Sequence, residues 1–255
     1  MSAEGAATFA RFAYPPNALG YCGPADAQGT LRAGAGAGPE QGPVDEDEVL
    51  ALARRFEGAW PYLELLAGDG GDPLAADVVD GYWLGNDRSA RIDADAFARH
   101  LHDRVGDRLG VPWESVAEAI AGGGRPTHAF HVLSASPFVA LARRGAIDQA
   151  LRVIDGCRIA PGEMVAVDGE EATVRIESLV WRTGAVRRGA PEERRVRCPG
   201  DGLLAGEPLS AGDRVAVHWD WVCDRLDAQR WAGLRAAQDQ QLELVERLGR
   251  VHDGP

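Results

Sequence analysis

The stretch Asp155-Gly156-Cys157-Arg158-Ile159-Ala160-Pro161-Gly162-Glu163-Met164 marks a change in the pattern of the chain. Before it, apolar residues recur at helical spacing; after it, they alternate with polar residues as they do in strands. We therefore expect an α+β protein: an all-helical domain over residues 1–155, followed by a small β-barrel with a C-terminal helix over residues 156–255.

Downstream of this stretch the sequence predicts five short strands. Met164–Val167 and Ala172–Glu177 alternate on either side of Asp168-Gly169, a pair typical of hairpin turns. Further strands are predicted at 179–186, 193–198 and 214–219, with a turn-rich connection at 187–191. Five strands with tight turns favour a closed, OB-like barrel. Asp227 is a suitable cap for a final helix that extends to about Leu248.

Upstream of the stretch, the pattern predicts roughly six helices. The first carries Phe9, Phe12 and Tyr14, and we expect Pro15-Pro16 to end it because proline has no amide N–H. A Gly/Ala-rich segment at about 33–43 predicts a flexible loop. The remaining helical predictions are 45–66, 73–84, 93–109, 112–120, 138–144 and 146–154.

Composition excludes several classes of protein. The net charge of -12 argues against a nucleic-acid binder, and the absence of lysine excludes Schiff-base chemistry and a P-loop lysine. Neither a signal pattern nor an apolar run long enough to span a membrane is present, so we expect a cytoplasmic protein with no membrane partner. The four cysteines are widely spaced without a CxxC pair, which predicts free thiols.

Two histidines and two cysteines are candidate metal ligands. His128 and His131 form an HxxH pair whose imidazoles would share one face of a helix, although no Glu completes a hydrolase motif and structural roles are the better interpretation. Cys22 is either a small buried group or a thiol that faces the same cleft as Cys157. One hypothesis is a metal-binding enzyme in which these four residues meet between the two domains and supply or modify a diatomic ligand.

Two motifs in the C-terminal third resemble the HypC/HupF family of [NiFe]-hydrogenase assembly chaperones. The first is Cys157-Arg158-Ile159-Ala160-Pro161-Gly162, followed by Met164-Val165-Ala166-Val167-Asp168-Gly169. The second is Gly212-Asp213-Arg214-Val215-Ala216-Val217-His218, on the last expected barrel strand. The family's cysteine is normally the mature N-terminus, whereas Cys157 is internal. The helical domain matches no family of known activity.

The resemblance implies a carrier with no catalytic residues and no permanently bound cofactor. The Cys157 thiolate would hold a transient Fe(CN)2(CO) fragment, and His218 would ligate the iron or orient the thiolate. The implied partners are the [NiFe]-hydrogenase large subunit and a HypD-like iron-scaffold protein. We expect the partner-binding residues to be Ile159, Pro161, Gly162, Trp219 and Trp221. A further alternative is a protein-interaction module whose barrel is a relic.

Overall fold

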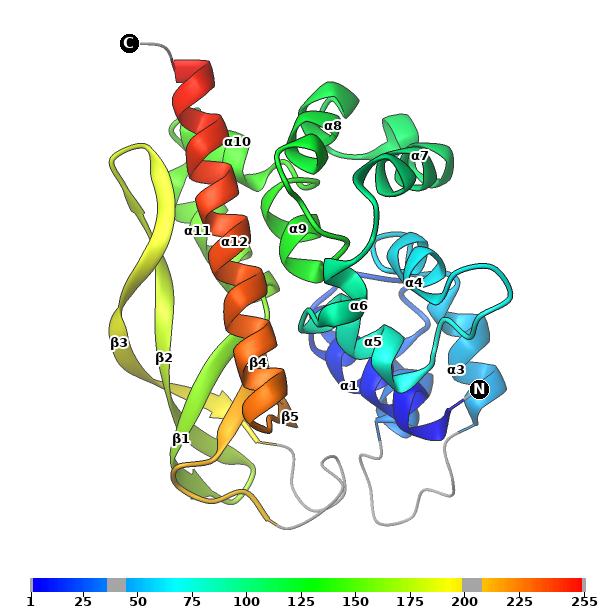
Figure 1. Cartoon of the computed structure of the whole chain (residues 1–255). Coiled ribbons are helices and arrows are strands. Elements are labelled where there is room, and N and C mark those ends of the chain that lie inside the picture. Colours follow the sequence, from blue (N-terminus) through cyan, green and yellow to red (C-terminus); the bar gives the residue numbers. More distant parts are fainter. Residues whose placement is uncertain (1, 36–44, 199–207, 254–255) are drawn as a thin grey trace.

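The computed structural model describes residues 2–35, 45–198 and 208–253. Helices occupy the N-terminal part, a closed five-stranded sheet follows, and a long helix ends the described chain (Figure 1). The predicted α+β class is therefore confirmed. Of the Gly/Ala-rich segment at 33–43, Ala33 and Gly34 end a helix, and residues 36–43 lie outside the described residues.

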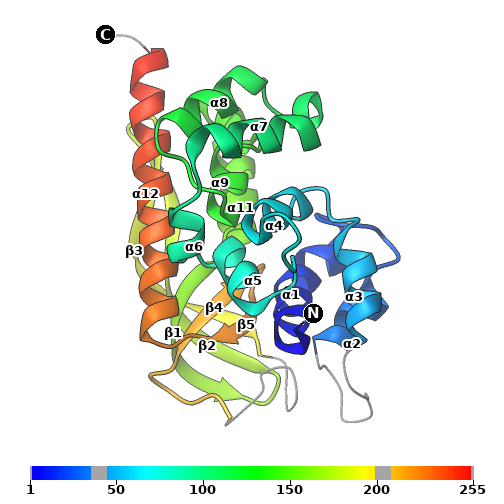
Figure 2. The ribbon, with the colours of Figure 1, turned by 45° about the vertical axis from the view of Figure 1, so that its right-hand side comes forward.

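The helical part consists mostly of short helices (Figure 2), and the aromatic side chains of Phe9, Phe12 and Trp83 pack together among them. Their bounds are α1 Ala3–Ala18, α2 Gln28–Gly34, α3 Glu46–Ala53, α4 Trp60–Ala67, α5 Ala76–Trp83, α6 Asp87–Ala90, α7 Ala94–Arg104, the 3-10 turn η1 Gly106–Arg108, α8 Trp113–Ala121, α9 His128–Leu133, α10 Phe138–Arg143 and α11 Ile147–Cys157.

Two helix predictions were wrong in their bounds, and the described helices are more numerous than the six expected. Helix α1 continues through Pro15 and Pro16 to Ala18, because prolines near a C-terminus leave only a few carbonyls without helical donors. The single helix expected at 45–66 is divided into α3 and α4. Between them Phe56 turns into the core and meets Phe9 edge-on at 5.4 Å.

The sheet closes into a barrel in the order β1-β2-β3-β5-β4, as expected for an OB-like arrangement. Its strands are β1 Ala160–Asp168, β2 Glu171–Arg182, β3 Ala185–Arg197, β4 Arg214–His218 and β5 Trp221–Arg225. Strands β2 and β3 form a long antiparallel hairpin, and β4 closes the barrel against β1. In Figure 1 the hairpin extends past the barrel alongside the C-terminal helix, α12 Ala228–Asp253.

The strand count was right, but the strand assignment was not. The predicted turn at 187–191 lies inside β3, and β2 joins two segments that were predicted as separate strands. The chain reverses instead at Thr183 and Gly184, whose φ angles of 48° and 77° are those of a tight two-residue hairpin turn. Strand β5 was not predicted at all. The arginine-rich composition of β3 resembles a loop, although long charged side chains are ordinary on the solvent face of a hairpin.

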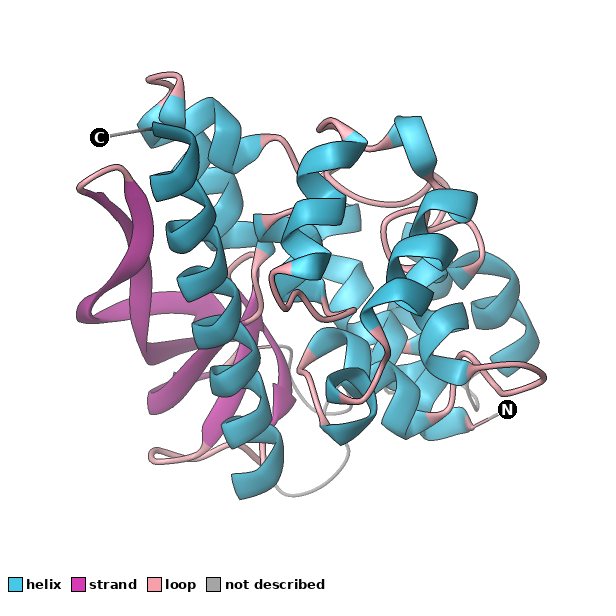
Figure 3. Cartoon of the chain, turned by 45° about the horizontal axis from the view of Figure 1, so that its top comes forward, coloured by secondary structure: helices cyan, strands magenta, loops and turns pink. Residues whose placement is uncertain are grey.

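The helical part and the barrel share a hydrophobic core. The main buried cluster joins residues of the first helices, such as Phe12 and Trp83, to Ile159, Ala216 and Cys223 of the barrel region. Helix α12 lies between the two parts (Figure 3) and buries Leu234 and Leu244 in the same cluster. The barrel interior, with Met164, Val174 and Val215, is a buried cluster of its own, so the shared cluster joins the helical part to the outer side of the barrel near residue 155. Within the described residues, none of the helices has the length and apolar character needed to cross a membrane.

Candidate functional site

Three ligand-type side chains converge where the helical part meets the barrel. His128 begins α9, Cys157 is the last residue of α11, and His218 is the last residue of β4. One candidate ligand atom from each lies within 4.8 Å of the other two. The cluster therefore takes residues from both sides of the helix-to-strand transition, and one of its imidazoles belongs to the HxxH pair.

The orientation of His218 depends on the two prolines of α1. A helical carbonyl at Phe12 would ordinarily accept from the N–H of residue 16, but Pro16 has none, and Pro15 cannot donate either. The Phe12 carbonyl instead accepts a hydrogen bond from His218 Nδ1 at 2.8 Å. Because a carbonyl only accepts, Nδ1 carries the proton and Nε2 presents a lone pair.

That Nε2 atom is buried and has no hydrogen-bond partner among the described residues. Only 1% of His218 is exposed. Burial lowers the pKa of the ring to about 4, against smaller opposing effects of the Phe12 and Cys157 backbone groups. The imidazole is therefore neutral near pH 7, which is the form that binds metal ions.

His128 is held from both sides. Its Nδ1 lies 3.1 Å from the Tyr82 hydroxyl, which in turn lies 2.9 Å from the Gly58 carbonyl. Its Nε2 lies 2.7 Å from the Cys157 carbonyl, which at the end of α11 has no helical donor. Burial, together with the neighbouring His218 and His131 rings, lowers the pKa of His128 well below 6.5. A neutral ring donates from one nitrogen only, so Nε2–H is bonded to Cys157 and Nδ1 accepts from Tyr82.

The Cys157 thiol is half-buried beneath Trp219. Burial raises its pKa to about 12, the nearby Cys22 adds to this, and the Trp219 side chain lowers it by a smaller amount. Trp219 is fixed against Gly156. Its backbone N–H donates to the Gly156 carbonyl at 2.9 Å, and a Cβ at residue 156 would meet the indole ring at 2.7 Å. Tyr21 stacks on the indole at 4.0 Å. The thiol is thus protonated at neutral pH unless a metal ion displaces its proton.

Outside Trp219 lies a groove of about 540 Å³. Trp221 borders it, and Arg197 lies over the Trp221 ring at 5.1 Å. The groove is therefore aromatic and carries equal numbers of arginines and carboxylates, and its lining residue Trp219 also interacts with the Cys157 thiol. Its other lining residues are Tyr14, Ala18, Leu19, Glu171, Arg195, Val196 and Asp220.

The remaining predicted site residues lie elsewhere. Cys22 is outside the cluster, and burial raises its thiol pKa to about 11. His131 points to Tyr62, 3.4 Å from its hydroxyl, and packs on Gly58. The predicted partner-binding residues differ among themselves: Trp219 and Trp221 are half-exposed, whereas Ile159, Pro161 and Gly162 are all buried. Ile159 packs in the main cluster, and a Cβ at Gly162 would meet Val174 inside the barrel at 2.4 Å, so these buried residues offer no surface to a partner in this conformation.

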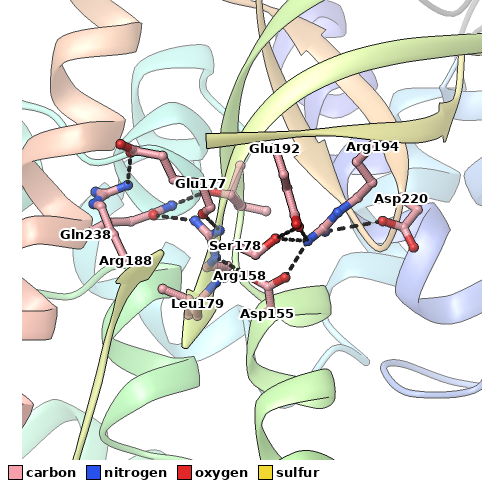
Figure 4. Close-up of polar contacts among 11 residues, drawn as sticks. Asp155, Arg158, Glu177, Ser178, Leu179, Arg188, Glu192, Arg194, Asp220 and Gln238 are labelled. Atoms are coloured by element: carbon pink, nitrogen blue, oxygen red, sulfur yellow. Dashed lines mark hydrogen bonds and ion pairs between the residues drawn. The ribbon is translucent and has the colours of Figure 1, made fainter. Parts of the chain in front are cut away.

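A buried polar network fixes the helix end that carries Cys157 (Figure 4). Arg158, 2% exposed, donates to the Asp155 carboxylate at 2.9 Å, to Gln238 of α12 at 3.0 Å and to the Glu177 carbonyl of β2. Arg194 of β3 joins Asp155 at 2.7 Å to Asp220 at 3.4 Å. The network therefore connects the residues beside Cys157 with the residue that follows Trp219.

Comparison with known proteins places the chain in one family. A family profile described as a family of unknown function, DUF6390, matches residues 1–252. The chain belongs to this family. The match spans the helical part, the barrel and most of α12, so the three ligand-type residues all lie within it. The search of curated proteins gave no match, and no solved structure matched either.

Sequence reasoning missed the residues that orient the cluster. Tyr82 and the carbonyl of Phe12 belong to the helical part, and neither carries a motif. One signal was available: Pro15-Pro16 inside an otherwise helical, apolar segment leaves two carbonyls without donors, and buried carbonyls require partners.

Proposed function

We propose that this protein is a [NiFe]-hydrogenase maturation factor that carries the Fe(CN)2(CO) fragment on Cys157 and docks on the hydrogenase large subunit. The observation that supports it most directly is the convergence of Cys157 and His218. Cys157 belongs to the first of the two motifs that carry the resemblance, and His218 belongs to the second. The proposal includes a HypD-like scaffold as the source of the fragment, a cytoplasmic location and no catalytic step.

The chemistry of the site suits this cargo. A thiolate is a soft donor that binds low-spin iron well, and a neutral imidazole beside it supplies a second, weaker donor. A neutral His218 leaves the site without a competing positive charge. Loading requires the thiol to lose its proton, and the incoming iron supplies the positive charge that stabilises the thiolate.

Access to Cys157 passes Trp219. The indole lines the groove, stacks on Tyr21, packs against Gly156 and interacts with the Cys157 thiol. A carrier that receives and releases cargo through this groove has to move the indole aside. We therefore assign docking to the groove lined by Trp219, Trp221 and Arg197, in place of the buried residues 159–162.

The test is hydrogenase activity in the native host after exchange of Cys157→Ala. We expect loss of activity and of the cyanide and carbonyl infrared bands of the purified protein, with the urea midpoint unchanged. Cys198→Ala is the matched control, because Cys198 is a buried thiol of the barrel core outside the cluster. Unaffected hydrogenase in the Cys157→Ala strain refutes the proposal, and co-purification with the large subunit and the scaffold supports it.

A further inference from the structure

We propose that His128, Cys157 and His218 together form a site at which the isolated protein binds one divalent transition-metal ion, with a fourth position left open. The helical part then contributes a ligand and is more than an attachment to the barrel. This inference does not depend on the hydrogenase role, since it concerns the binding of the bare ion. Its supporting observations are the separation of the donor atoms, the hydrogen bonds behind the two imidazoles and the bare nitrogen of His218.

The donor atoms are close to the spacing that a metal ion requires. Metal–ligand distances of about 2.0–2.3 Å place the ligand atoms of a tetrahedral site about 3.5 Å apart. The three atoms here lie within 4.8 Å of one another. A closure of about one ångström brings them to that spacing. Two imidazoles and one thiolate favour ions of the Fe²⁺, Co²⁺ and Zn²⁺ class over Mg²⁺ or Ca²⁺, which prefer oxygen.

Both imidazoles have the supporting hydrogen bonds that metal-bound histidines usually make. His218 donates Nδ1–H to the Phe12 carbonyl, which directs Nε2 into the cluster. His128 reaches the same state by a tautomer change: Nδ1–H donates to the Tyr82 oxygen, Tyr82 donates to the Gly58 carbonyl, and Nε2 is freed from Cys157. Each hydroxyl and ring nitrogen then has a partner, and the protons balance.

A purely structural role explains only part of this arrangement. His128 has partners on both ring nitrogens, as a histidine of a protein core should. His218 differs: its Nε2 is buried, faces the Cys157 backbone and accepts no hydrogen bond among the described residues, and a buried acceptor without a donor destabilises a fold. A metal ion at this position satisfies that lone pair and uses the Cys157 sulfur beside it, with release of the thiol proton to the buffer.

The test is a Co²⁺ titration of the full chain after treatment with a chelator, followed by absorption spectroscopy. We expect one equivalent of Co²⁺ to bind with a thiolate-to-cobalt charge-transfer band. His128→Gln and His218→Gln should each weaken binding by more than about a hundredfold, and Tyr82→Phe by about tenfold, as is usual for the loss of a supporting hydrogen bond. His131→Gln is the matched control from the same helix and should leave the affinity within about threefold.

A measurement on the unaltered protein covers the case in which a variant does not fold. Histidine nitrogen NMR with Zn²⁺ should show His128 change from the Nε2–H to the Nδ1–H tautomer, while His218 keeps Nδ1–H and its Nε2 signal shifts. The inference is overturned if the His128 tautomer does not change with Zn²⁺, or if Co²⁺ gives no charge-transfer band. It is also overturned if His128→Gln binds Co²⁺ with unaltered affinity. If Co²⁺ does not bind yet Cys157→Ala still abolishes hydrogenase activity, only this inference fails. If Co²⁺ binds and that strain keeps its hydrogenase, only the proposed function fails.

Discussion

Replacement of Arg158 by Met should destabilise the protein by about 3 kcal/mol, because its guanidinium connects three elements inside the core. Arg158→Met retains most of the aliphatic volume and removes the hydrogen bonds to Asp155, Gln238 and Glu177. Removal of one partner of a buried ion pair costs about 3–5 kcal/mol when the other charge is left alone.

The lower end of that range applies here. Asp155 keeps Arg194 at 2.7 Å and the Leu179 N–H at 2.9 Å, so its charge is not left without partners. The remaining cost comes from the Gln238 and Glu177 oxygens, which lose a charged donor in the core. Two such acceptors at about 1 kcal/mol each, with the weakened contact to Asp155, again give about 3 kcal/mol.

The assay is equilibrium unfolding in urea, with the free energy of unfolding taken at an unchanged m-value. Arg175→Met is the matched control: the same exchange on β2, the strand whose Glu177 carbonyl accepts from Arg158, at a side chain that is 48% exposed and paired with Glu163 and Glu193. Exposed pairs contribute at most about 1 kcal/mol. Should the two variants agree within about 0.5 kcal/mol, the network does not hold the end of α11, and the argument from burial is wrong.

Three further predictions test the core and the site. Lowering the pH from 7 to 5 should reduce the free energy of unfolding of the metal-free protein by about 2 kcal/mol per buried histidine. Burial lowers the pKa of His131 and His218 to about 4, whereas a histidine in the unfolded chain titrates near 6.5. Below pH 6.5 the unfolded state therefore binds more protons than the folded state, and stability is lost as the pH falls. A flat series of urea midpoints from pH 7 to 5 would contradict this. Gly156→Ala should displace the Trp219 indole and speed the reaction of Cys157 with a thiol reagent, since the added Cβ meets the ring at 2.7 Å; unchanged kinetics would argue against a covering role. In an ordinary helix a Gly→Ala exchange stabilises by about 1 kcal/mol. Gly233→Ala should instead destabilise this protein, because the added Cβ would meet the Gly85 carbonyl at 2.4 Å. A gain in thermal stability would show that α12 is not tightly packed against the segment that carries Gly85.

Local patterns predicted the fold class because they are dictated by neighbours in the sequence. The alternation after Gly162 predicted the first hairpin, but its turn is Gly169-Glu170 and not Asp168-Gly169, because Asp168 still pairs with Glu171. The same patterns failed where long-range contacts decide the structure. Strand β5 exists because Val222 and Cys223 complete the barrel against β4, and Trp219 and Asp220, with φ angles of 49° and 60°, make the tight turn before it. A run of two aromatics and an aspartate does not predict such a turn.

The candidate site shows the same division. Cys157 and His218 could be named from the sequence because each belongs to a motif, whereas nothing local distinguishes His128 from His131. An HxxH pair predicts two imidazoles on one face of a helix, yet α9 directs His128 to Tyr82 and Cys157, and His131 to Tyr62. Only the packing of α9 between α5 and α11 separates the two roles.

The position of the cluster also explains why the helical part and the barrel share a core. His218 is a barrel residue, but the carbonyl that fixes its tautomer belongs to Phe12 in α1. His128 is a helical residue, but its Nε2 meets the end of the helix that leads into the barrel. His218 is therefore oriented by the helical part, and a barrel expressed alone from residue 156 would retain Cys157 and His218 without the Phe12 carbonyl that fixes the His218 ring. Cys157 lies between the two parts, with His128 of α9 on one side and His218 of β4 on the other.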